Sequence, residues 1–197
     1  VIGDPIAHSK SPQMHNPALM ARGIEAQYVR VQVPVGQVKE AFGLFARQGF
    51  LGVNITIPHK VNAMTFVDWV HPLAQRMGAI NTIVVQPDGA LHGFNHDGFG
   101  FMQSLLAAQP TWKADHHPIV VIGAGGAARG ILVSLIDAGA TNIRLINRTH
   151  SKAQELAQSF GNIVSCVKWE EREDALSGAS LLINTTNQGM HGEPALE

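Results

Sequence analysis

Short apolar runs alternate along this chain with segments whose apolar residues recur at helical spacing. That alternation is typical of α/β proteins with mostly parallel sheets. In the first half, the pattern predicts strands at 1–2, 28–33 and 51–57, a helix at 35–48, and short helical pieces at 61–66 and 73–77. Val38, Phe42 and Phe45 lie on one face of the 35–48 helix, so this face is expected to be buried.

Prolines mark a helix start and a turn in the same half. Ser11-Pro12 predicts a helix with Ser11 as its N-cap and proline at the first helical position. Pro17 is expected to kink that helix or divide it. The tripeptide Pro87-Asp88-Gly89 predicts a hairpin between strands at 81–86 and 91–94.

A polar stretch at 109–118, which contains two prolines, is the expected linker between two domains. A helix is expected at 97–108, just before it. After it the pattern predicts strands at 119–122, 143–146, near 164 and at 181–183, and helices at 127–138 and 151–160. The fold class is therefore α/β. An N-terminal α/β domain is expected at 1–108, and an incomplete Rossmann-type doubly wound domain at 119–197.

Composition and charge restrict the possible partners. The chain has 197 residues, and 45% of them are hydrophobic, which is enough for packed cores and excludes wholesale disorder. Lys and Arg number 14 against 15 Asp and Glu, so no global charge attracts nucleic acid or an anionic membrane. No apolar run approaches the ~20 residues of a membrane span, and no signal peptide is visible.

The single cysteine and the ten histidines give little sign of special chemistry. Cys166 cannot form an intrachain disulfide, which favours a reducing cytoplasm, and its apolar neighbours predict a small buried hydrophobe. The histidines form no Cys/His cluster, so no metal site is expected.

The segment Gly123-Ala124-Gly125-Gly126-Ala127-Ala128 follows an apolar strand and opens a helix. Gly123 permits a tight turn, Gly125 lets the backbone approach a pyrophosphate, and Ala128 lets the helix pack close to the strand. The free N–H groups and the helix dipole then meet the negative charge. In this strand–loop–helix context we predict a dinucleotide site, the alternative being a glycine-rich turn without a ligand.

The end of the next strand indicates which dinucleotide binds. NAD-specific folds usually place an acid there, but this chain has Asn147-Arg148-Thr149, with Lys152 one turn later, and no carboxylate before Glu155. A guanidinium with hydroxyl and amide donors suits a 2′-phosphate, so NADP is the predicted cofactor. A solvated arginine without a ligand is the alternative.

Polar side chains gather at strand ends and helix starts of the first half, where α/β domains carry ligand sites. They offer hydroxyls and amides for a polyol, and Lys60 and Asp97 for proton transfer at a developing alkoxide. Taken singly, Ser11 could be only an N-cap, Lys60 a solvated charge and Asp97 a helix cap. The four segments are 8–12, 54–60, 78–82 and 95–98.

Seven ordered motifs resemble those of the shikimate dehydrogenase family. They are Ser9-Lys10-Ser11-Pro12, Asn54-Ile55-Thr56-Ile57-Pro58-x-Lys60, Gly78-Ala79-Ile80-Asn81-Thr82, Asn95-x-Asp97-Gly98, Gly123-Ala124-Gly125-Gly126-Ala127, Asn147-Arg148-Thr149 and Asn184-Thr185-Thr186. The resemblance runs from residue 2 to about 194. It implies reversible NADPH-dependent reduction of 3-dehydroshikimate to shikimate, in aromatic amino-acid and chorismate biosynthesis in the cytoplasm. A relative that takes quinate or NAD, and a ligand-binding module without turnover, are the alternatives.

The resemblance also implies roles for individual residues. Ser9 and Ser11 resemble the hydroxyls that bind the substrate carboxylate, Lys60 and Asp97 the catalytic pair. The residues that resemble those holding the ring hydroxyls are Thr56, Asn81 and Asp97. The expected cofactor-binding residues are Gly123, Gly125, Gly126, Ala127, Asn147, Arg148, Thr149 and Lys152. The implied partner is a small-molecule substrate, and a homodimer is left open.

Four residues, at three sites, depart from the family pattern. His59 stands where the family often has Phe, and His96 where it usually has Thr. Either could alter the pKa of its neighbour, and a surface histidine without a role is the alternative. Asn187-Gln188 replaces a commoner Ser-containing pair in the cofactor loop. The chain is also expected to be a fragment, because it lacks an initiator Met and the family continues beyond Glu197.

Overall fold

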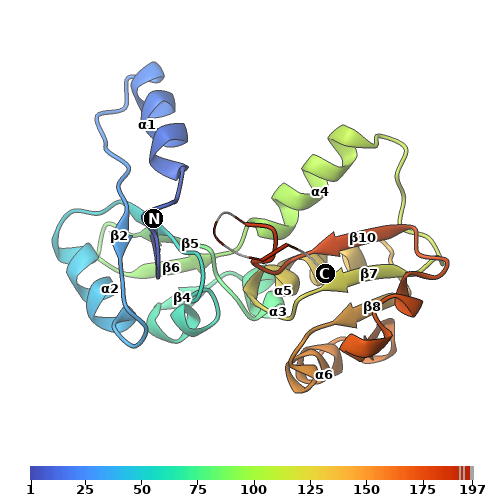
Figure 1. Ribbon diagram of the computed structural model, residues 1–197. Coiled ribbons are helices and arrows are strands. Elements are labelled where there is room, and N and C mark those ends of the chain that lie inside the picture. Colours follow the sequence, from blue (N-terminus) through green and yellow to red (C-terminus); the bar gives the residue numbers. More distant parts are fainter. Residues whose placement is uncertain (191, 193, 196–197) are drawn as a thin grey trace. The chain divides into compact units, whose positions relative to one another are not determined.

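The computed structural model describes residues 1–190, 192, 194 and 195. The chain forms two compact units, Val1–His96 and Asp97–Glu197 (Figure 1). The division falls before the expected linker at 109–118. The assignment of 1–108 to a substrate domain and 119–197 to a cofactor domain stays a prediction.

The first unit contains a mixed sheet and a short parallel ladder. Its helices are α1 (Ser11–Ala21), α2 (Val38–Arg47), the 3₁₀ helix η1 (Asn62–Phe66) and α3 (Pro72–Met77). Its strands are β1 (Ile2–Gly3), β2 (Val31–Gln32), β3 (Gly52–Asn54), β4 (Trp69–Val70), β5 (Thr82–Val85) and β6 (Leu91–Phe94). The mixed sheet has the order β3-β5-β6-β4, and β1 pairs with β2 in parallel. A bridge between Ile2 and Ile55 connects the two ladders.

The helical periodicity located the core of this unit correctly. Val38, Phe42 and Phe45 are all buried, and they pack with strand residues such as Val53 and Ile83. The predicted hairpin is also confirmed, since β5 and β6 pair antiparallel on either side of the Pro87-Asp88-Gly89 turn.

One prediction about α1 is wrong, and another is settled only in part. Lys10, not Ser11, is the N-cap residue, and Ser11 is the first residue of the helix. The backbone N–H of Ser11 is instead accepted by the Ser9 hydroxyl, 3.3 Å away. Pro17 does not divide the helix, which runs through it as one element, and the kink expected as the alternative stays a prediction. A proline removes one N–H donor, and the loss of that bond is not enough to end this helix.

The strand predicted at 28–33 is shorter in the structure. Only Val31–Gln32 forms β2. The backbone N–H of Tyr28 donates to Oδ1 of Asn16, and its carbonyl accepts from Nδ2 of Asn16, so neither group pairs with a neighbouring strand. The two-residue strand β4 was not predicted at all. It exists through its parallel pairing with β6, in which Trp69 faces His92.

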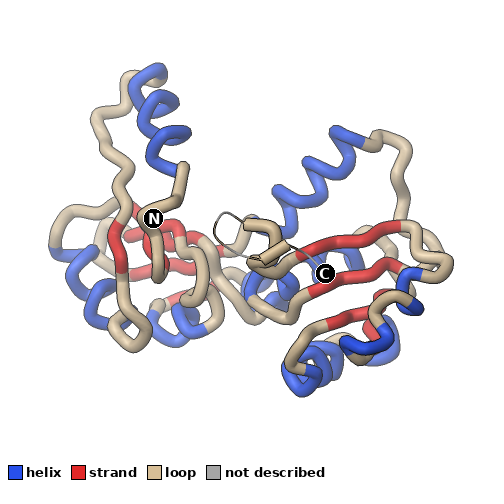
Figure 2. Tube along the Cα trace, viewed as in Figure 1, coloured by secondary structure: helices blue, strands red, loops and turns tan. Residues whose placement is uncertain are grey.

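The second unit is a parallel sheet with helices. Its helices are α4 (Asp97–Ala108), α5 (Gly126–Asp137) and α6 (His150–Gln158), with 3₁₀ helices η2 (Gly161–Ile163), η3 (Trp169–Glu171) and η4 (Asp174–Leu176). Its strands are β7 (Ile119–Ile122), β8 (Ile143–Ile146), β9 (Val164–Val167) and β10 (Leu181–Asn184). All neighbours in the order β10-β7-β8-β9 pair in parallel, and Figure 2 shows these strands in red. Counted along the unit, the order is 4-1-2-3, that of half a Rossmann fold.

Apolar side chains cover both faces of this sheet. Ile119 and Val121 point into one buried cluster with α5 and α6, while Val120 and Ile122 point into another cluster, with Ala175. A strand buried on both faces explains why β7 is continuously apolar. The α/β fold class with a Rossmann-type unit is confirmed. Among the described helices, none is both long and apolar enough to span a membrane.

Candidate active site

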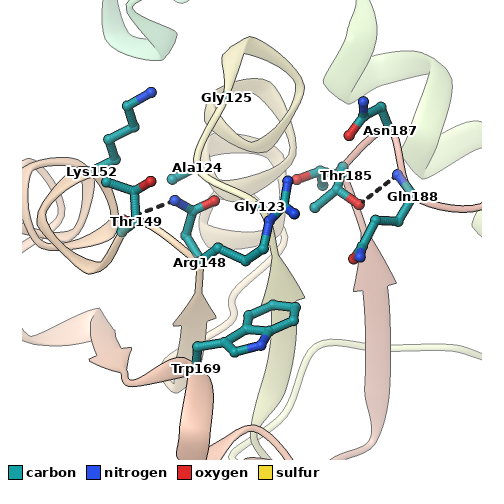
Figure 3. Close-up of a pocket in the computed structure, with 12 residues that line it drawn as sticks. Gly123, Ala124, Gly125, Arg148, Thr149, Lys152, Trp169, Thr185, Asn187 and Gln188 are labelled. Atoms are coloured by element: carbon teal, nitrogen blue, oxygen red, sulfur yellow. Dashed lines mark hydrogen bonds between the residues drawn. The ribbon is translucent and has the colours of Figure 1, made fainter. Parts of the chain in front are cut away.

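A pocket of about 300 Å³ lies in the second unit at the carboxyl ends of β7, β8 and β10 (Figure 3). The order of the strands reverses between β7 and β10, which is where doubly wound sheets bind their ligands. The described lining residues are Gly123, Ala124, Gly125, Asn147, Arg148, Thr149, Lys152, Trp169, Thr185, Thr186, Asn187 and Gln188. Six of the eight predicted cofactor residues are among them.

Position 123 requires a glycine, both for its backbone conformation and for the space that its neighbours leave. Its φ of +109° lies in the left-handed region that side chains disfavour. A Cβ at this position would overlap the Thr185 hydroxyl and lie 3.1 Å from Cγ2 of Thr186. The loops after β7 and β10 therefore approach each other at this glycine.

The start of α5 faces this loop with uncapped donors. Gly125 is its N-cap residue in an extended conformation, and no side chain caps the helix. Gly126 and Ala127 are its first two residues, so their positions contribute backbone to the helix start rather than side chains to the pocket wall. Free N–H groups at a helix N-terminus attract anions, which suits a pyrophosphate.

The segment after β8 supplies the positive charge. Asn147 donates from Nδ2 to the Thr149 carbonyl at 2.9 Å, and this turn leads into α6. Arg148, Thr149 and Lys152 line the pocket beside it. None of the lining residues in the described part of the chain carries a carboxylate, so the local charge favours an additional phosphate.

The expected cofactor-binding residues left out part of the pocket, although the sequence analysis had placed Asn187-Gln188 in the cofactor loop. The segment from Thr185 to Gln188 enters it because β10 pairs with β7, although the two strands are far apart in sequence. Asn184 organises this segment: its Oδ1 accepts the backbone N–H of Thr186 at 2.9 Å, and its Nδ2 donates to the Gln188 carbonyl at 3.0 Å. Gln188 is buried, so the unusual Asn187-Gln188 pair belongs to an ordered turn. The signal available was the Asn184-Thr185-Thr186 motif at a strand end. Trp169 carried no motif.

In the first unit, the two predicted serines lie together. The Ser9 hydroxyl donates to Oγ of Ser11 at 3.2 Å. Tyr28, which sequence reasoning missed, is a hydrogen-bond partner of Ser11, and its hydroxyl donates to Oδ1 of Asn54 at 2.6 Å. Burial raises the pKa of Tyr28, and the hydrogen bond with Ser11 partly offsets this rise. Tyr28 therefore connects the serine pair to the end of β3.

This series of hydrogen bonds continues from Asn54 at the end of β3 to the backbone of His96, just before α4. Asn54 donates from Nδ2 to the Thr82 hydroxyl at 3.1 Å, which in turn donates to Oδ1 of Asn81 at 2.8 Å. The same Oδ1 accepts the backbone N–H of His96 at 3.1 Å. Asp97, the next residue, begins α4. The antiparallel pairing of Asn54 with Thr82 brings these amides together.

Lys60 lies in a loop that hydrogen bonds hold on two sides. Its carbonyl accepts the Ile80 backbone N–H at 2.8 Å, which places the loop beside the 78–82 segment. The preceding residue, His59, is only 2% exposed, and its Nε2 lies 2.7 Å from the Val33 carbonyl, to which it must donate. The alternative of a surface histidine without a role is therefore wrong for His59. Thr56 is half-buried in the same loop.

The two units each contain part of the predicted site. Ser9, Ser11, Thr56, Lys60 and Asn81 belong to Val1–His96, whereas Asp97 begins the second unit. The substrate-binding roles and the pairing of Lys60 with Asp97 stay predictions.

Cys166 lies beside a histidine. Cys166 is half-buried rather than fully buried, its Sγ lies 3.4 Å from Nδ1 of His150, and burial raises the pKa of its thiol. Among the described residues, no three His, Cys, Asp or Glu side chains gather closely enough to hold a metal ion.

A parallel sheet of Rossmann order, with a glycine loop and a cationic pocket at its switch point, defines the dinucleotide-binding proteins as the class of this chain. Residues 1–83 match the family model of the shikimate dehydrogenase substrate binding domain, and residues 106–191 match that of shikimate / quinate 5-dehydrogenase. The chain belongs to the shikimate dehydrogenase family.

Individual relatives agree with this assignment. The chain is 45% identical over 196 residues to a shikimate dehydrogenase (NADP(+)) of Ruegeria sp. (strain TM1040), covering 100% of this chain and 71% of that protein. The solved shikimate dehydrogenase of Aquifex aeolicus superposes with a TM-score of 0.90 at 33% identity, over 99% of this chain and 70% of that one. Shikimate 5-dehydrogenase of Thermus thermophilus, solved with NADP(H) and shikimate, gives a TM-score of 0.82 at 39% identity, over 96% and 68% of the two chains.

Proposed function

We propose that this protein is an NADP-dependent oxidoreductase that reversibly reduces 3-dehydroshikimate to shikimate. The observation that carries the proposal is the pocket of the second unit, where two cations and a glycine loop meet without a carboxylate among the described lining residues. That donor set fits a pyrophosphate and a 2′-phosphate on one ligand.

Different residues of the pocket would bind the pyrophosphate and the 2′-phosphate of NADP. Backbone groups at Gly123, Gly125, Gly126 and Ala127 would hold the pyrophosphate, because the positive end of α5 stabilises negative charge. The 2′-phosphate would be held by a second set of donors: Asn147, Arg148, Thr149 and Lys152. When bound, the reduced cofactor supplies the hydride for the carbonyl carbon.

The first unit holds the substrate in this proposal. Ser9 and Ser11, already hydrogen-bonded to each other, turn their hydroxyls to the substrate carboxylate. The amides and hydroxyls that continue from Asn54 suit a polyol ring, because each can both donate and accept. Thr56, Asn81 and Asp97 hold the ring hydroxyls.

Lys60 performs the proton transfer. As hydride reaches the carbonyl carbon, the oxygen gains negative charge, and the Lys60 ammonium gives it a proton to form the C–OH group. In the reverse direction the neutral amine takes that proton back. Asp97 orients the ammonium and stabilises its charge. The loop bonds at His59 and Ile80 fix the backbone from which Lys60 reaches out.

The setting follows from the same reaction. We propose that the protein acts in the cytoplasm, in aromatic amino-acid and chorismate biosynthesis. Residues 1–108 would form the substrate-binding catalytic domain, 109–118 the linker and 119–197 the cofactor domain. A homodimer is compatible with the proposal and is not required by it.

The test is a steady-state assay with two acids and two cofactors. The purified protein is given shikimate or quinate with NADP⁺ or NAD⁺, and kcat/KM is measured for each of the four pairs. The highest value is expected for shikimate with NADP⁺. A preference for quinate or NAD⁺ would refute the proposal and identify the protein as the related dehydrogenase that takes quinate or NAD. Ligand binding without turnover in any pair would make the chain a binding module.

A further inference from the structure

One wall of the second unit's pocket is aromatic. Trp169 comes just after β9, and its indole is the single aromatic side chain among the described lining residues (Figure 3). The remaining residues offer backbone N–H groups, hydroxyls, amides and the cations of Arg148 and Lys152. Such groups suit phosphates and ribose hydroxyls, whereas a heteroaromatic base binds best on a flat ring.

The indole is held firmly. It packs against the buried cluster of Val120, Ile122, Ile146 and Ala175. The Cζ atom of Arg172 lies 5.1 Å from the centroid of the ring, and Nη1 of Arg172 donates to the Trp169 carbonyl at 3.3 Å. A ring that is already fixed loses little conformational freedom when a ligand stacks on it.

The covalent structure of the cofactor places its base near this ring. In NADP the adenine and the 2′-phosphate are carried by neighbouring carbon atoms, C1′ and C2′, of one ribose. A 2′-phosphate at Arg148 therefore brings the base within a few ångströms of Arg148. Strands β8 and β9 pair in parallel with Ile146 opposite Val167. Arg148 and Trp169 each stand two residues beyond that pair, so the two side chains start from adjacent strand ends.

We propose that Trp169 stacks on the adenine base of NADP and fixes the ribose so that its 2′-phosphate meets Arg148. This role rests on the proposed function, because it requires NADP to occupy the pocket. Trp169 thereby supplies selectivity for an aromatic base, which the polar lining residues do not provide.

The experiment measures binding of two base-carrying probes, adenosine 2′,5′-bisphosphate and 5′-AMP, by titration calorimetry. Trp169→Ala is expected to raise Kd for both probes by the same factor, about 5- to 100-fold, because both carry the base. Trp169→Phe keeps a ring and should retain most of the affinity. Arg148→Gln, the comparison variant, should weaken only the bisphosphate. Trp69→Phe, which changes a tryptophan of the first unit, should alter neither Kd.

Fluorescence gives a second readout that a purely structural role would not change. Adenosine 2′,5′-bisphosphate should quench the tryptophan emission of the wild-type protein and of Trp69→Phe, but not that of Trp169→Phe. This measurement needs no alanine variant, so it holds even where Trp169→Ala fails to fold. Unchanged Kd values in Trp169→Ala, equal losses in Trp169→Phe and Trp169→Ala, or quenching that persists in Trp169→Phe would overturn the proposal. A wild-type protein that binds neither NADP⁺ nor the bisphosphate would instead refute the proposed cofactor.

Discussion

Gly98 is the position where the structure makes its sharpest stability prediction. It lies in the first turn of α4, directly after Asp97, and it is buried where α4 packs against α5. A Cβ at Gly98 would overlap the Ser134 hydroxyl, and it would lie 2.5 Å from the Gly130 carbonyl oxygen and 3.1 Å from Cβ of Ser134. The Ser134 hydroxyl can rotate away, but the Gly130 carbonyl is part of the α5 backbone.

Gly98→Ala must therefore push the two helices apart. Overpacking of this kind costs about 1–3 kcal/mol, and a clash with backbone belongs at the upper end. Alanine returns about 0.5–1 kcal/mol through its higher helix propensity, so the net loss of unfolding free energy is about 2 kcal/mol. Gly100 is the matched control, because it lies in the same helix and a Cβ there meets no atom within 4 Å. Gly100→Ala should stabilise the protein by about 0.5–1 kcal/mol.

Urea unfolding followed by far-UV circular dichroism separates the two variants. The wild-type protein, Gly98→Ala and Gly100→Ala are compared at equal protein concentration, and the urea dependence of each must be the same for the free energies to be subtracted. The expected gap between the two alanine variants is about 3 kcal/mol, the sum of the two effects. If Gly98→Ala is as stable as Gly100→Ala, the close approach of α4 and α5 at this glycine is wrong.

Three further predictions concern the proposed reaction. Lys60→Ala should lower kcat by roughly 10²–10⁴ with a smaller change in substrate KM, and Asp97→Ala should resemble it without adding to it in the double variant; a near-normal kcat would remove Lys60 from the chemistry. Ser9→Ala and Ser11→Ala should each raise KM for the acid, since a hydrogen bond to a carboxylate contributes about 1.5–3 kcal/mol; an unchanged KM with a lower Tm would leave the serines only a structural role at the start of α1. Arg148→Gln should weaken NADPH binding and leave NADH binding nearly unchanged in a fluorescence titration, whereas equal losses would mean that Arg148 holds the base or the loop.

Local patterns in the sequence were enough for elements whose signals lie within a few residues. The helix predicted at 97–108 has those bounds in the structure, and the hairpin forms at its predicted turn. The glycine loop and the cations after β8 were found because strand–loop–helix context and residue type are readable along the chain. The same holds for the buried face of α2.

Other features depend on contacts between distant segments. Tyr28 reaches Asn54 across 26 positions, and the buried His59 has its hydrogen-bond partner in the Val33 carbonyl, just after β2. The N-cap of α1 is Lys10 rather than the predicted Ser11, and the N–H of Ser11 donates to the hydroxyl of Ser9, which lies outside the helix. No local pattern encodes such partners, since each depends on how the segments pack.

The pocket of the second unit combines features that the sequence predicts with features that depend on the tertiary structure. The sequence by itself determined that a glycine turn opens α5 and that cations follow β8, because steric freedom and charge belong to single residues. Only the tertiary structure decided that Thr185 and Trp169 line the same pocket, since parallel pairing places β10 and β9 on either side of β7 and β8. A strand carries no local mark of which edge of the sheet it will join. Which strands become neighbours depends on how the connecting segments pack on both faces of the sheet, a property of the whole unit.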